Sequence, residues 1–205
     1  PTHRTLAAIK ESGKLIVLTR NAPTTYYIDR EDSQAGPEFE LVIAFADYIG
    51  LEVEIIEKDT IKELLDALSQ GEGDLIAAGL TETVKRGKQF RFGPTYQTVS
   101  EQVVCRRGGA RPTKVEELVG LNIEVIANSS YSEGLKRYKD SIPQLSWITN
   151  EEEDTEQLLE KVWRKQIDCT IADSNIVSIN QRYFPELVVV FEFGKAANIA
   201  WAMPK

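Results

Sequence analysis

The chain has 205 residues, with 24 Lys or Arg against 32 Asp or Glu, so its formal net charge is −8. Hydrophobic residues make up 42% and charged residues 27%, a composition typical of a globular protein that buries a core, which excludes a mainly disordered chain. The acidic balance argues against a nucleic-acid partner. No apolar run approaches the roughly 20 residues that a membrane-spanning helix needs, so we expect no membrane span in this chain.

Few residues are available for histidine, cysteine or metal chemistry. The one histidine is His3, in an expected N-terminal tail, so we expect neither Ser-His-Asp hydrolysis nor a typical zinc site, and no cofactor. The two cysteines, Cys105 and Cys169, fall on expected strands. We interpret them as buried free thiols, with a disulfide between them as the alternative. The stretch Pro1–Lys14 lacks the apolar core of a signal peptide, which leaves the compartment open.

Strand and helix patterns alternate through the first hundred residues. A helix that ends at Gly13 is followed by an expected strand, and four further elements continue the alternation. In chain order they are a strand over Leu15–Thr19, a helix over Glu38–Ile49, a strand over Leu51–Glu57, a helix over Thr60–Gln70 and a strand over Asp74–Gly79. This alternation predicts an α/β fold with parallel strands and right-handed crossovers.

The second half continues in the same way. Ser130 and Glu133 have the spacing of a capping box, and the acidic run Glu151–Asp154 is interpreted as an exposed loop that leads into a helix. The expected strands are Gln102–Cys105, Leu121–Ala127, Leu145–Ile148, Asp168–Ala172, Leu187–Phe191 and Ile199–Met203. The expected helices are Ser130–Lys139, Asp154–Lys165 and Ser174–Tyr183.

Polar side chains follow several of these strands, at the sheet edge where α/β proteins bind ligands. They offer an aromatic ring, a hydroxyl, a guanidinium, N–H donors at a helix start and a carboxylate. Such a set suits a small zwitterion, because a guanidinium binds a carboxylate and a carboxylate pairs with an ammonium. The candidate residues are Tyr26 or Tyr27, Thr81, Arg86, Ser129, Ser130 and Asp173.

Each candidate also has a purely structural interpretation. Arg86 could be an exposed arginine on a short helix, and Asp173 could be the N-cap of the helix that follows it. Ser129 and Ser130 could be helix caps, and Thr81 a turn residue. Paired catalytic carboxylates are conceivable among Glu38, Glu40 and Glu82, but Glu38 and Glu40 suit a helix N-terminus better, so we expect no catalytic residue. Trp147, Trp163 and Trp201 are interpreted as packing residues.

Four segments carry motifs of a known family: Gly36–Leu41, Gly73–Thr81 followed by Arg86, Phe92–Tyr96 and Asp168–Ser174. Together they resemble the type II periplasmic solute-binding fold of the bacterial extracellular solute-binding proteins, family 3, in the branch that binds polar amino acids. The resemblance implies two lobes, each a mostly parallel sheet flanked by helices, with the ligand cleft between them. Lobe 1 would hold residues 1–98 plus 193–205, and lobe 2 residues 99–192.

The resemblance also implies roles for individual residues. Arg86 stands where the family grips the ligand α-carboxylate, with Thr81 beside it, and Asp173 stands where a carboxylate takes the α-ammonium. Ser129 and Ser130 stand in the helix-start loop. Tyr26 is favoured over Tyr27 as the ring that covers the ligand. Two departures, Asn128 for a common glycine and Glu82 near the carboxylate position, bear on which ligand is bound.

A more specific resemblance is carried by the sequences AAGL, GPTY and TIADS and by the segment Asn180–Leu187. These are similar to the N-terminal regulatory module of the membrane-bound lytic transglycosylase F subfamily. It implies a non-catalytic module in the periplasm, in a parent protein attached to the outer membrane. Its partners would be an amino acid or the end of a short peptide or muropeptide, and a C-terminal catalytic domain that cleaves peptidoglycan. We expect that domain, and the fold's final helix, to lie outside this chain.

Three alternatives stay open on the sequence. The chain could be a free-standing amino-acid receptor of an ABC importer. It could be the sensor domain of a membrane receptor kinase. It could also resemble the fold's deaminase or dehydratase relatives, although no catalytic motif favours an enzyme.

Overall fold

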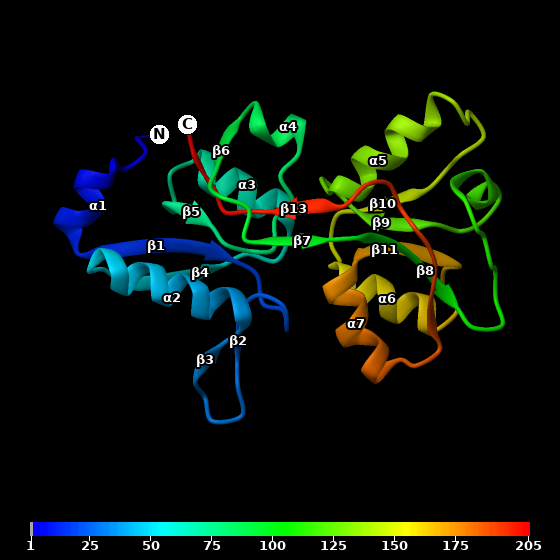
Figure 1. Ribbon diagram of the computed structural model, residues 1–205, viewed down its shortest axis with the longest axis horizontal. Coiled ribbons are helices and arrows are strands. Elements are labelled where there is room, and N and C mark those ends of the chain that lie inside the picture. The colour runs from blue at the N-terminus through cyan, green and yellow to red at the C-terminus, as the bar shows by residue number, and fades with distance from the viewer. Residues whose placement is uncertain (1) are drawn as a thin grey trace. The chain divides into compact units, whose positions relative to one another are not determined.

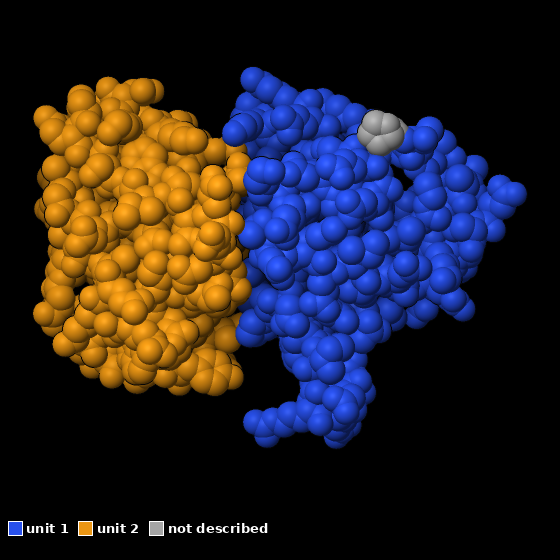
Figure 2. All heavy atoms as spheres, turned by 180° about the vertical axis from the view of Figure 1, so that it is seen from behind, with its two compact units in different colours: residues 1–97, 198–205 blue, residues 98–197 orange. Residues whose placement is uncertain are grey.

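The computed structural model describes residues 2–205 and divides into two compact units. Unit 1 holds residues 1–97 and 198–205, and unit 2 holds residues 98–197; Figure 2 colours them separately. The chain therefore passes between the units twice. The strands at these two passages, β7 (Gln97–Val99) and β13 (Ala197–Ile199), pair with each other.

Unit 1 is built on a five-stranded mixed sheet with the order β4-β1-β5-β14-β6. Its strands are β4 (Glu52–Glu57), β1 (Lys14–Thr19), β5 (Leu75–Ile76), β14 (Ala202–Pro204) and β6 (Phe90–Phe92). Strand β1 is parallel to β4 and β5, whereas β14 is antiparallel to both β5 and β6. The strand that returns from unit 2 is therefore the one that runs against the others.

Helices cover both faces of this sheet (Figure 1). One core joins α1 and α2 to residues of β1 such as Val17, and the other joins α3 to residues such as Leu18. Neighbouring strand residues thus feed opposite cores, as the two-residue period of a strand requires. The elements are α1 (Leu6–Ser12), α2 (Pro37–Ile49), α3 (Ile61–Ser69), the short α4 (Val84–Gly87) and a hairpin of β2 (Tyr27–Ile28) and β3 (Gln34–Ala35).

Unit 2 repeats the same arrangement of strand directions. Strand β8 is antiparallel to both β11 and β12, β9 is parallel to β10, and a parallel bridge between Ile123 and Cys169 joins the two groups. Here too the strand that runs against the others, β8, is the one that enters from the other unit. The strands are β8 (Glu101–Arg106), β9 (Glu124–Ile126), β10 (Ile148–Asn150), β11 (Cys169–Asp173) and β12 (Leu187–Glu192). The helices are η1 (Val115–Leu118), α5 (Ser130–Lys139), α6 (Thr155–Trp163) and α7 (Ser174–Tyr183).

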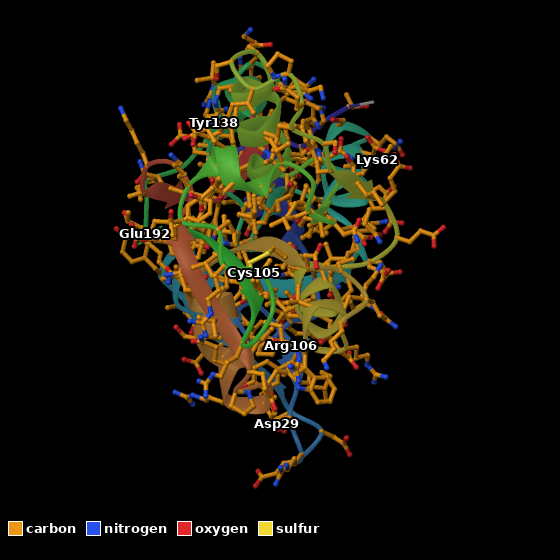
Figure 3. The ribbon with its side chains drawn as sticks, turned by 90° about the vertical axis from the view of Figure 1, so that its right-hand side faces the viewer. Asp29, Lys62, Cys105, Arg106, Tyr138 and Glu192 are labelled. Atoms are coloured by element: carbon orange, nitrogen blue, oxygen red, sulfur yellow. A yellow bond between two sulfur atoms is a disulfide. The ribbon has the colours of Figure 1, made fainter. Side chains whose placement is uncertain are left out.

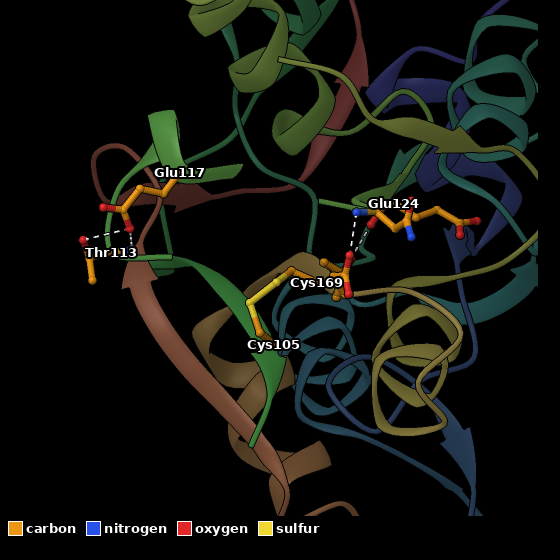
Figure 4. The surroundings of a disulfide bond; sticks show 8 residues. Cys105, Thr113, Glu117, Glu124 and Cys169 are labelled. Atoms are coloured by element: carbon orange, nitrogen blue, oxygen red, sulfur yellow. Dashed lines mark hydrogen bonds between the residues drawn. A yellow bond between two sulfur atoms is a disulfide. The ribbon is translucent and has the colours of Figure 1, made fainter. Parts of the chain in front are cut away.

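Cys105 and Cys169 form a disulfide, so the prediction of free thiols is wrong. They lie directly opposite each other on the antiparallel strands β8 and β11, with Cα atoms 4.3 Å apart. This spacing matches the closer kind of antiparallel pair, which brings side chains together. Both residues are fully buried in a core of unit 2 (Figures 3 and 4). The sequence separation of 64 residues gave no information on this register.

Helix boundaries agree with the predictions more closely than strand boundaries. The predicted strand Leu145–Ile148 is displaced, because Leu145 is fully buried just after a turn and pairing begins only at Ile148. The predicted strand Ile199–Met203 is two strands, β13 and β14, and the predicted Asp74–Gly79 strand pairs only at Leu75–Ile76. The N-cap of α5 is Ser129 rather than Ser130, so the predicted capping box is wrong. A capping box occurs instead at Asp154 and Gln157, where the acidic run leads into α6.

Candidate functional site

In unit 1, Arg86 is buried beside Thr81 on the connection from β5 to β6. The short helix α4 starts at the N-cap Thr83, whose hydroxyl accepts from the Arg86 backbone N–H at 3.2 Å. The Arg86 side chain turns back, and its Nη1 donates to the Thr81 carbonyl at 2.7 Å. Arg86 is only 4% exposed, so the alternative of an exposed arginine is wrong. The segment therefore presents a buried guanidinium at the carboxyl end of a central strand.

A buried carboxyl group, Glu38, lies behind the same segment. It is the second residue of α2, and its Oε2 accepts from the Gly79 backbone N–H at 2.6 Å. Its Oε1 accepts from the Tyr96 hydroxyl. Burial raises the pKa of Glu38 from 4.5 to about 7, although Tyr96, Gly79, Trp201 and the charge of Arg20 oppose the shift. This environment could not be predicted from the sequence, because an acid in the first turn of a helix is usually exposed.

Tyr26 lies within the packing of unit 1. It is 4% exposed, its ring meets Phe39 edge-on with centroids 5.5 Å apart, and its hydroxyl accepts from Gln34 Nε2 at 3.1 Å. Tyr27 is the first residue of β2 and is partly exposed. The hydroxyl and the ring of Tyr26 thus make contacts typical of a tyrosine in a protein core.

In unit 2, the loop from β9 to α5 forms a helix start held by side chains. Asn128 has a φ of 56°, in the left-handed region that favours glycine or asparagine, which explains why asparagine can stand where the family commonly has glycine. Ser129 is the N-cap: its hydroxyl accepts from the Ser132 N–H and donates to the Ile126 carbonyl. The Ser130 hydroxyl donates to Glu101.

Asp173 ends β11, and its carboxylate is held by a tyrosine. The Tyr131 hydroxyl donates to Asp173 Oδ1 at 2.8 Å and accepts from the Asp173 backbone N–H at 2.9 Å. Asp173 occupies the N-cap position of α7, as the structural interpretation expected, although its side chain makes no capping hydrogen bond there. Burial raises the pKa of Tyr131 well above 10, and the charges of Asp173 and Glu101 add to the shift, so this hydroxyl stays protonated as a donor.

Glu101 connects the predicted residues of unit 2. It is 8% exposed, lies opposite Asp173 in the register of β8 and β11, and accepts from Ser130. The structure therefore groups Ser130 and Asp173 in unit 2, and Thr81 and Arg86 in unit 1. Sequence reasoning missed Glu101 and Tyr131. Glu101 directly precedes the expected strand Gln102–Cys105, and this place at a strand end is the signal that could have identified it.

Other features carry less weight. A shallow depression of about 560 Å³ in unit 1 is lined by Ser12, Gly13, Lys14, Asp47, Gly50, Leu51 and Glu52, none of which is a predicted site residue. Trp163 packs on Phe184, and Trp201 on Phe45 and Tyr96, in line with packing roles. Within residues 2–205, no group of three or more His, Cys, Asp or Glu side chains could hold a metal ion.

The fold consists of two units, each with a mixed sheet, and the chain passes between them twice. This arrangement defines a type II solute-binding protein. A family model described as bacterial extracellular solute-binding proteins, family 3, matches residues 14–186. The chain belongs to this family.

Curated relatives place the chain more narrowly. It is 39% identical over 201 residues to membrane-bound lytic murein transglycosylase F 1 of Alkalilimnicola ehrlichii, covering 98% of this chain and 40% of the relative. It is 42% identical over 200 residues to membrane-bound lytic murein transglycosylase F of Pseudoalteromonas translucida, covering 98% and 42%. The chain thus spans about two fifths of the length of these relatives.

Solved structures agree on the fold. Holo ArgBP from T. maritima superposes with a TM-score of 0.86 at 22% identity, covering 98% of this chain and 87% of that one. AbpA of Streptococcus pneumoniae, an amino acid ABC transporter substrate-binding protein bound to L-arginine, gives 0.83 at 24% identity, covering 98% and 85%. At these identities the likeness establishes the type II fold and leaves the ligand open.

Proposed function

We propose that this chain is a non-catalytic binding module that takes an amino acid or the end of a short peptide. Arg86 of unit 1 would hold the ligand carboxylate, with Thr81 beside it, and Asp173 of unit 2 would hold the ammonium. The observation that carries the proposal is the burial of Arg86 at a strand end, with one guanidinium nitrogen fixed on the Thr81 carbonyl. A guanidinium held in this way is oriented for an anion before the ligand arrives.

The arrangement in unit 2 supports the complementary role. Tyr131 fixes one oxygen of Asp173, and Glu101 adds a second buried acid on the neighbouring strand. Two acids on neighbouring strands give this part of unit 2 a local negative charge, which would attract the cationic group of a ligand. Ser129 and Ser130 would contribute at the start of α5, and Tyr26 would cover the apolar part of the ligand. A ligand that satisfied both Arg86 and Asp173 would favour the conformation in which both reach it.

The relatives support a choice of ligand class. Matches at about 40% identity to lytic transglycosylases favour an amino acid or stem peptide derived from peptidoglycan over the ligand of an importer. In a parent protein with a C-terminal catalytic domain, ligand binding would then regulate cleavage allosterically, through a coupling free energy between the binding site and the catalytic site. A periplasmic location, with the parent protein attached to the outer membrane, agrees with the family description and with a disulfide, since disulfides persist in oxidising compartments. No helix among residues 2–205 has the length and apolarity to cross a membrane.

Calorimetry tests the proposal. The titrants are L-arginine, L-glutamine and a peptidoglycan stem tripeptide, each added to the wild type, to Asp173→Asn and to Asp140→Asn. Asp140 is an exposed residue of unit 2, at the C-cap of α5, and serves as the matched control. We expect at least one titrant to bind the wild type and the control equally, and Asp173→Asn at least about tenfold more weakly. Equal binding by all three proteins would remove Asp173 from the site.

A further inference from the structure

Glu38 joins two segments of unit 1 that are far apart in the sequence. Its Oε2 takes the Gly79 N–H, 41 residues away, and its Oε1 takes the Tyr96 hydroxyl, 58 residues away. The residue is 4% exposed, so little water competes for these hydrogen bonds. A buried carboxyl with two such partners is held in one orientation inside unit 1, unlike an exposed charge at a helix end.

Both partners belong to segments that matter for the proposed site. Gly79 lies two residues before Thr81, whose carbonyl holds Arg86. Tyr96 directly precedes β7, the first passage to unit 2, and its backbone N–H donates to the Ile199 carbonyl at 3.1 Å, just after the second passage. The Glu38 carboxyl therefore connects the segment that holds the guanidinium to both connecting segments.

The start of α2 holds Glu38 in this place. A Cβ atom at Gly36 would lie 2.2 Å from the Thr25 carbonyl oxygen, so the helix start packs on Thr25 more closely than any other residue would allow. The Phe39 N–H donates to the same oxygen at 3.2 Å. With its backbone fixed, Glu38 has little freedom to turn its carboxyl away from Gly79.

We propose that Glu38 is a positioning residue of the ligand site, which ties the Gly79–Thr81 segment to the connecting segment at Tyr96 and whose protonation strengthens binding of the ligand carboxylate. The proposal rests on the proposed function for its ligand half. When protonated, Glu38 can donate to the Tyr96 oxygen; when ionised, it can only accept. Ionisation also adds a negative charge to the unit that would bind an anion, so binding should weaken.

The surroundings of Glu38 place this change near neutral pH. The groups that act on it are the Tyr96 hydroxyl before β7, the Gly79 amide after β5, Trp201 before β14 and the cationic Arg20 after β1. Burial outweighs all four, which gives the pKa of about 7. The Glu38 carboxyl of the native protein would therefore lose its proton between pH 5.5 and pH 8.5.

The first experiment needs no ligand. The amide chemical shift of Gly79 is followed by NMR from pH 5.5 to 8.5 in the wild type, in Glu38→Gln and in Glu40→Gln. Glu40 is an exposed acid in the same helical turn and serves as the control. We expect a titration with a midpoint near pH 7 in the wild type and the control, and none in Glu38→Gln. A Gly79 shift that stays flat in the wild type overturns the protonation of Glu38 in this range, and a Gly79 shift that is the same in Glu38→Gln as in the wild type at every pH overturns the positioning role.

The second experiment adds a ligand, with L-arginine as the probe because its charges stay constant over most of this range. We expect its Kd for the wild type to rise about threefold to tenfold from pH 5.5 to 8.5, and its Kd for Glu38→Gln to stay near the low-pH value throughout. The same pH dependence in both proteins overturns the ligand half of the inference. If the wild type binds L-arginine at no pH, the proposed function is contradicted for this ligand, and so is the claim that Glu38 protonation strengthens its binding. The Gly79 titration still decides the positioning role in that case.

Discussion

Removing the Cys105–Cys169 disulfide should destabilise unit 2 and leave unit 1 nearly unchanged. The bond closes a loop over 64 residues that begins and ends in unit 2. In the chain-entropy model, a loop of this length restricts the unfolded chain by roughly 14 cal/mol/K, which is about 4 kcal/mol at 25 °C. Because both cysteines are fully buried, a double substitution to alanine also loses packing, on the order of 1 kcal/mol.

The assay is urea unfolding of the oxidised wild type and of the Cys105→Ala/Cys169→Ala variant, followed by tryptophan fluorescence. Trp147 and Trp163 report on unit 2, and Trp201 reports on unit 1, so single-tryptophan versions separate the two transitions. For a unit of about 100 residues the urea m-value is about 1 to 1.5 kcal/mol/M, so 4 kcal/mol lowers the unit 2 midpoint by about 3 M or more.

Two outcomes would refute this reasoning. The first is a change of less than about 1 kcal/mol in unit 2, which would mean that the closed loop is already restricted in the unfolded chain. The second is an equal loss in both units, which would mean that they unfold as one cooperative body. As a control, a reducing agent should lower the stability of the wild type and have no effect on the alanine variant.

The remaining predictions concern Glu38, Tyr131 and Arg4. Replacing Glu38 by Gln should remove a pH dependence of stability: the folded pKa of about 7 exceeds the unfolded value of 4.5, so stability present below pH 4.5 is lost as the pH rises to 7, by about 3 kcal/mol. The difference between the unfolding free energies of the two proteins, measured from pH 4.5 to 8, should grow by that amount in favour of the variant; a constant difference contradicts the shift. Tyr131→Phe should cost about 1 to 3 kcal/mol in urea unfolding and weaken ligand binding several-fold in calorimetry, because Asp173 loses its fixed donor; unchanged affinity would show that Tyr131 does not orient that carboxylate. Arg4→Ala should lower the unfolding free energy of unit 1, measured by thermal unfolding, by about 2 kcal/mol, because two guanidinium nitrogens of Arg4 bind the buried Asp74 carboxylate. Arg4→Lys should restore only part of this free energy; full restoration would show that the paired geometry is unimportant.

Periodicity and glycine stops predicted the helices well because those features act locally. Gly13 and Gly50 end α1 and α2 in the left-handed conformation, and Thr60 caps α3 by its hydroxyl. Strand edges were harder to place, because an apolar side chain is buried alike in a strand and in a turn. Leu145 is an example: it is fully buried but lies outside any strand.

The candidate site was predictable where one segment supplies the chemistry, and not where distant segments meet. Arg86 and Asp173 were predicted from their places at or after expected strand ends, and the structure puts Asp173 at the end of β11 and Arg86 on the connection from β5 to β6. Glu38, Tyr131 and the partners of Glu101 depend on which side chains the fold brings together across tens of residues. The disulfide is of the same kind, because it depends on the pairing register of β8 and β11.

The central claim, a binding module whose buried arginine takes a ligand carboxylate, is tested most directly by one calorimetric comparison. The best titrant among L-arginine, L-glutamine and the stem tripeptide is added to the wild type, to Arg86→Ala and to Arg91→Ala, whose arginine is exposed on β6. We predict unchanged affinity for Arg91→Ala and a loss of at least about 30-fold, equivalent to about 2 kcal/mol, for Arg86→Ala. Equal affinity in all three proteins would contradict the account.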